Sequence, residues 1–128
     1  MIDFVEHVAA VEGELSKERG PFVLFALLAH EDLPDRWDLM VSAPWIESKD
    51  VIVEDLVNRI ASKAGREELI NLSRIVVAEP NNPAVIAFNK AVRAEHKRLE
   101  FRDDILFGQP VKHAIVITSR RPDVLVSR

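Results

Sequence analysis

The chain has 128 residues, of which 48% are hydrophobic and 30% charged, with a formal net charge of −4 and no cysteine. This length suits a single domain, and the composition is too apolar for a disordered chain. The acidic balance argues against a general affinity for nucleic acid, and the missing cysteines exclude disulfides and thiolate metal sites. No apolar run reaches membrane-spanning length and no basic leader opens the chain, so we expect a cytoplasmic protein without a membrane partner.

The first third of the sequence predicts a helix followed by a hairpin. Four apolar residues recur at helical spacing: Phe4, Val8, Val11 and Leu15. Gly20 and Pro21 mark the end of this helix. Residues 22–29 are apolar at every position, which predicts a strand covered on both faces, and residues 37–45 alternate between apolar and polar, which predicts its antiparallel partner.

Capping residues divide the middle of the chain into two further helices with a strand between them. Ser48 is placed to cap a helix that ends at Gly65, and residues 73–79 predict the third strand. Asn82 and Pro83 form a cap and first-turn pair for a helix that we expect to reach about residue 96. Lys97 and Arg98 would then lie near its C-terminal end, where cations complement the helix dipole.

Two more strands, over residues 99–102 and 111–119, complete the predicted sheet, with an irregular segment at 103–110 between them. The centre of the last strand, residues 114–117, is apolar on both faces, so it belongs in the interior of the sheet. The order of elements is αββαβαββ. It predicts an α+β fold, in which helices pack on a mixed sheet of about five strands, for a single domain over residues 1–119.

One motif suggests metal-dependent chemistry. Pro34 and Asp35, followed by Glu47 and Lys49, match the spacing of nucleases in which two carboxylates hold a divalent cation and a lysine assists the attacking water. Asp35 falls in the predicted hairpin loop, whereas Glu47 lies beyond the opposite end of the second strand, and Asp38 is only a somewhat nearer partner. We therefore expect a turn acid and a helix-capping segment here, and we predict no metal site and no cofactor.

The four histidines lack the spacing of a metal motif. His30 ends the first strand and His113 begins the last, so the two imidazoles could meet in a ligand site if these strands are antiparallel neighbours. His7 and His96 are expected at solvated helix positions.

The sequence predicts interface residues more readily than catalytic ones. Trp37 and Trp45 share a face of the second strand in the predicted hairpin and are candidates for contact with a partner. The tail, residues 120–128, is either flexible or forms an interface in which Val124 and Val126 pair with a neighbouring sheet. The leading interpretation is a non-catalytic binding or assembly module that acts as a homo-oligomer. The alternative is a divalent-metal-dependent phosphodiesterase or nuclease.

Overall fold

The fold is built on one five-stranded mixed sheet. The computed structural model describes residues 4–29, 36–106 and 109–120. Its strands are β1 (Leu24–Ala29), β2 (Trp37–Ser42), β3 (Leu72–Val77), β4 (Leu99–Leu106) and β5 (Gln109–Ser119). They lie in the order β3-β2-β1-β5-β4, and β2 and β3 are the only parallel neighbours among them. The predicted α+β class and mixed sheet are confirmed.

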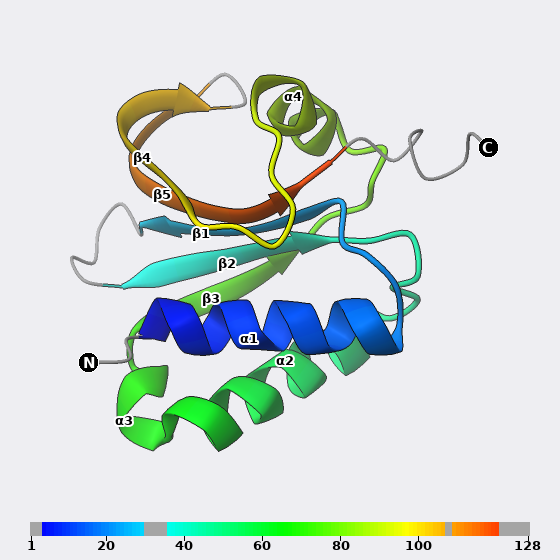
Figure 1. Cartoon of the computed structure of the whole chain (residues 1–128), viewed down its shortest axis with the longest axis vertical. Coiled ribbons are helices and arrows are strands. Elements are labelled where there is room, and N and C mark those ends of the chain that lie inside the picture. Colours follow the sequence, from blue (N-terminus) through cyan, green and yellow to red (C-terminus); the bar gives the residue numbers. More distant parts are fainter. Residues whose placement is uncertain (1–3, 30–35, 107–108, 121–128) are drawn as a thin grey trace.

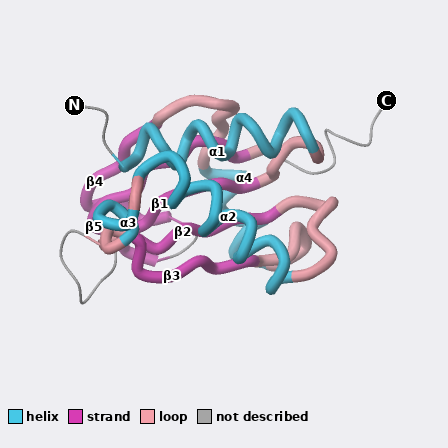
Figure 2. The backbone as a smooth tube through the Cα atoms, turned by 90° about the horizontal axis from the view of Figure 1, so that it is seen from below, coloured by secondary structure: helices cyan, strands magenta, loops and turns pink. Residues whose placement is uncertain are grey.

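Helices cover both faces of the sheet (Figure 1). They are α1 (Phe4–Glu18), α2 (Lys49–Ala64), α3 (Arg66–Leu69) and α4 (Pro83–Ala91). Figure 2 shows α1 and α2 side by side in front of the strands, whereas α4 packs on the opposite face. The short helix α3 is an addition to the predicted order αββαβαββ. No helix among the described residues is long and apolar enough to cross a bilayer.

Two apolar cores lie on either side of the sheet. The larger lies beneath α1 and α2 and includes the fully buried Leu15, Phe25 and Leu56, while the smaller lies beneath α4 and includes Val85 and Phe88. The middle strands contribute to both cores, because successive residues of a strand face opposite sides of the sheet. β1 lies between β2 and β5, and β5 between β1 and β4, so the prediction of two interior strands is confirmed.

Several predicted boundaries differ from the structure, most of all those of β2, α4 and the hairpin of β4 and β5. β2 ends at Ser42, before Pro44, so Trp45 lies outside the strand. α4 ends at Ala91, because the next residue, Val92, has extended backbone angles. Residues 103–106 and 109–110, which we expected to be irregular, extend β4 and β5 into a longer hairpin.

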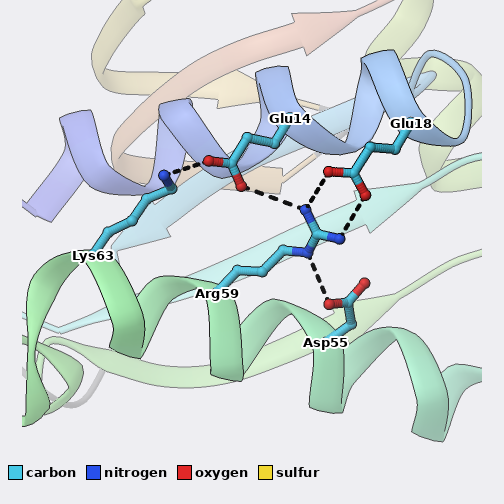
Figure 3. Close-up of polar contacts among 5 residues, drawn as sticks. All are labelled: Glu14, Glu18, Asp55, Arg59 and Lys63. Atoms are coloured by element: carbon cyan, nitrogen blue, oxygen red, sulfur yellow. Dashed lines mark hydrogen bonds and ion pairs between the residues drawn. The ribbon is translucent and has the colours of Figure 1, made fainter.

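A network of ion pairs fixes α1 against α2 (Figure 3). The Arg59 guanidinium donates to Asp55 on its own helix at 2.8 Å and to Glu18 on α1 at 2.7 Å, and it also contacts Glu14 at 3.4 Å. Lys63 pairs with Glu14 as well. The hydrogen bond from Arg59 lowers the pKa of the Glu18 carboxyl. These contacts lie on the flank of α1 that faces α2.

Candidate functional site

A buried acid interrupts the apolar face of α1. Glu12 is 1% exposed and lies among Val8, Val11 and Leu15, which are fully buried. A carboxylate in such a place costs free energy unless hydrogen-bond donors surround it. The three groups that contact it come from α1 itself, from β5 and from the segment after α4.

The first partner from outside the helix reaches Glu12 because β5 contains a bulge. Phe25 pairs with Thr118 and Ala26 with Val116, so Ile117 has no partner residue on β1. The extra residue reverses the alternation of side chains beyond it. Ile117 and Thr118 therefore both face α1, and the Thr118 hydroxyl donates to Oε2 of Glu12 at 2.8 Å.

The second partner is His96, in the segment that runs from α4 down toward α1 (Figure 1). Backbone hydrogen bonds tie this segment to β5: Ala94 and Ser119 exchange two, and Lys97 N–H donates to Ile117. His96 itself has a φ of 52°, in the left-handed region that L-residues rarely adopt. Its N–H donates to the Thr118 hydroxyl oxygen at 3.2 Å, and its Nδ1 lies 2.9 Å from Oε1 of Glu12.

These contacts determine which atom of His96 is available to a ligand. Ser16 and Thr118 both donate to Oε2 of Glu12, and a carboxylate has no hydrogen to donate from its other oxygen, Oε1. Nδ1 of His96 therefore carries the hydrogen that points to Oε1. Nε2 lies on the other side of the ring and forms no hydrogen bond within the described part of the chain. The imidazole is half exposed, with 53% of its side-chain surface accessible.

A pocket of about 410 Å³ opens beside this network. It is lined by Ala9, Pro21 and Ile117 and by Glu12 with five further residues: Gly13, Ser16, Lys17, His96 and Lys97. Here "the Glu12 pocket" denotes this space. The residues that line it carry a carboxylate, an imidazole, a hydroxyl and two ammonium groups, so it can bind a polar ligand by charge-assisted hydrogen bonds.

Gly13 makes room for the pocket. Glycine in the middle of a helix costs about 0.5–1 kcal/mol relative to alanine. A Cβ atom built on Gly13 would meet nothing within 4 Å, so close packing does not explain the glycine. The missing side chain instead leaves part of the pocket wall open.

The acids of the nuclease motif are not brought together in the described residues. Asp38 is near the start of β2 and pairs with Arg74 at 3.1 Å, whereas Glu47 and Lys49 are exposed beyond the far end of that strand. Asp35 lies outside the described residues. The described part of the chain contains no group of three His, Asp or Glu residues arranged to hold a metal ion.

His113 has partners other than the predicted one. Its Nε2 lies 2.5 Å from the Glu100 carboxylate on β4, and its ring contacts Trp37 edge-on at a centroid distance of 4.9 Å. The hydrogen bond from His113 lowers the pKa of the Glu100 carboxyl, and Arg102 beside it acts in the same direction. His30 lies outside the described residues, so the predicted histidine pair stays a prediction.

The two tryptophans, predicted to share a face of one strand, lie in different settings. Trp37 is the first residue of β2, partly buried against the larger core. Trp45 follows the strand, where its ring contacts Phe22 and its Nε1–H donates to Pro21. Val124 and Val126 lie outside the described residues. A role of these four residues in an interface stays a prediction.

The sequence interpretation missed the residues of the Glu12 pocket. It placed His96 on a solvated helix, which is wrong because α4 ends five residues earlier. It placed Lys97 at that helix end, which is wrong for the same reason. The available signal was Glu12, whose position four residues after Val8 puts an acid on the apolar face of α1.

Comparison of the chain with protein families, with characterised proteins and with solved structures finds no match.

Proposed function

We propose that this chain is a cytoplasmic, non-catalytic binding module that holds a small polar ligand in the Glu12 pocket. The observation that carries the proposal is Gly13, a helix glycine that no neighbouring atom requires and whose missing side chain opens the pocket beside a buried acid. If position 13 had only a structural role in α1, alanine would suit it better than glycine, because alanine favours the helix more.

Filling the pocket from Gly13 tests the proposal. A set of small neutral, cationic and anionic organic molecules is screened at millimolar concentration by amide chemical shifts. We expect some members to shift the signals of Gly13, Ser16 and Lys97. Binding should vanish in Gly13→Leu and persist in Ala10→Leu, which adds the same side chain at an exposed position of α1. The proposal is wrong if no molecule perturbs the pocket, or if Gly13→Leu leaves the shifts unchanged.

The edge of the sheet supports a second part of the proposal, self-association. Among the described strands, β3 pairs with β2 alone. Ala78 N–H donates to Val41 of β2, and hydrogen-bonding groups alternate along a strand. Those of Ile75 and Val77 therefore point away from β2, since the pairing of β3 with β2 is regular from Arg74 onward. An edge of this kind can pair with the same edge of a second copy across a twofold axis.

Val77→Pro tests this edge, because proline is tolerated in an edge strand where its nitrogen faces outward, and Val77→Ala controls for the lost side chain. Light scattering should give a dimer for the wild type and for Val77→Ala, and a monomer for Val77→Pro. A monomeric wild type at every concentration, or a dimeric Val77→Pro, would exclude pairing through β3. A chain that ends at Ser119 tests the predicted role of Val124 and Val126 separately: an unchanged mass would show that the tail is not needed for assembly.

A further inference from the structure

We infer that the ligand of the Glu12 pocket carries a phosphate monoester group, held by Lys17, Lys97 and the Nε2–H of a protonated His96. This inference rests on the proposed binding function and adds the chemical class of the ligand. It starts from two cations that the fold places at one pocket from distant parts of the chain: Lys17 on α1 and Lys97 after α4.

Several cations lack an ion pair among the described residues, Lys49 and Lys90 included, and Lys17 and Lys97 differ from those two in lining the pocket. Arg59, Lys63 and Arg74 each pair with a carboxylate. Within residues 4–29, 36–106 and 109–120, the ammonium groups of Lys17 and Lys97 form no ion pair. The only acid that lines the pocket with them is Glu12, whose oxygens already accept hydrogen bonds from His96, Ser16 and Thr118. The lysines are therefore available to an external anion.

His96 supplies the third donor. Glu12 fixes the ring through Nδ1, so a proton taken up by His96 must reside on Nε2, on the side of the ring that is free. A carboxylate that orients a histidine in this way also sets the direction in which its second nitrogen donates.

The balance of charge selects the class of anion. Two lysines and a protonated His96 carry three positive charges, and Glu12 carries one negative charge, so the pocket has a net charge of +2 within a chain whose net charge is −4. A phosphate monoester near neutral pH carries between one and two negative charges and offers three terminal oxygens, one for each donor. A carboxylate has one charge and two oxygens. The volume of about 410 Å³ leaves room for a small organic group beside the phosphate.

Calorimetry with matched probes tests the inference. The probes are glycerol 3-phosphate, glycerate and glycerol, which share a carbon chain and differ in their anionic group. We expect glycerol 3-phosphate to bind more tightly than glycerate, and glycerol not to bind. Lys17→Gln and Lys97→Gln should each weaken binding about tenfold, as expected for the loss of one charged hydrogen bond. Lys90→Gln, an exposed position on α4 outside the pocket, should leave it unchanged.

Protonation of His96 gives an independent readout. At a pH where the free imidazole is neutral, binding of glycerol 3-phosphate should take up a proton, so the measured enthalpy should depend on the ionisation enthalpy of the buffer. His96→Gln can still donate to Glu12 but cannot carry the charge, so this variant should bind weakly and show no proton uptake.

The outcomes separate this inference from the proposed function. If the screened molecules bind in the pocket but glycerol 3-phosphate binds no better than glycerate, the phosphate assignment is wrong and the binding function stands. If Lys90→Gln weakens binding as much as Lys17→Gln, the attraction is a general charge effect and the assignment is also wrong. If no molecule of either set occupies the pocket, both fail.

Discussion

Replacing Gly13 by alanine should stabilise the protein, which is unusual for a substitution at a candidate binding site. The new Cβ would meet nothing within 4 Å, so the change adds no clash and no packing. What remains is helix propensity, because alanine loses less conformational entropy than glycine when the helix forms. The expected gain is about 0.5–1 kcal/mol, which corresponds to a rise in Tm of about 2–5 °C for a domain of this size.

Urea and thermal unfolding followed by circular dichroism measure this gain, and Ala10→Gly provides the matched control. Ala10 is exposed on the same helix, so its replacement by glycine reports the propensity difference in α1 with the opposite sign. The two changes should be equal in size and opposite in direction. If Ala10→Gly costs the expected amount and Gly13→Ala gives no gain, then Gly13 serves the packing of α1, and the reasoning that it provides space for a ligand is refuted.

Two further variants test the contacts that hold α1. Thr118→Val removes the hydroxyl that links Glu12 to the His96 backbone, so it should cost about 1–2 kcal/mol in urea unfolding, with a smaller loss in Thr118→Ser; equal losses would show that the hydroxyl is not the stabilising group. Arg59→Met should lower stability, and the loss should shrink in 1 M salt because the ion pairs are partly exposed. Since the hydrogen bond from Arg59 lowers the pKa of Glu18, the stability from this pair is present above the ordinary value of 4.5 and is lost as pH falls below it. Acid unfolding of Arg59→Met should therefore depend less steeply on pH in that range, and an unchanged slope would contradict this account.

The sequence predicts the elements whose signals are local. Ser48 and Asn82 cap α2 and α4 as expected, through side chains that accept hydrogen bonds from Val51 and Ala84. The uninterrupted apolar run in residues 22–29 identifies the central strand, because only a strand covered on both faces is apolar throughout. These features depend on a few neighbouring residues, so they can be recognised without knowledge of the tertiary structure.

The candidate site depends on long-range features that leave little local signal. The bulge at Ile117 arises where β5 pairs with β1, and strict alternation in the sequence would place Thr118 on the face of α4. The early end of α4 is fixed by the hydrogen bonds that Ala94 and Lys97 form with β5. His96 reaches Glu12 only when both conditions are met. A residue-by-residue interpretation therefore placed His96 in solvent and could not bring the two together.

Three departures from regular structure meet at the Glu12 pocket. They are a glycine within a helix, a bulge in an interior strand and a histidine with positive φ. Each costs free energy, on the order of 1 kcal/mol for the glycine and somewhat more for the histidine backbone. Most residues of the two cores come from regular helices and strands, although the bulged Ile117 also packs in the larger core. If selection acted on stability alone, each of these three costly features would be replaced independently of the other two. Their coincidence around one buried acid is the pattern expected where binding requires a geometry that regular elements do not supply.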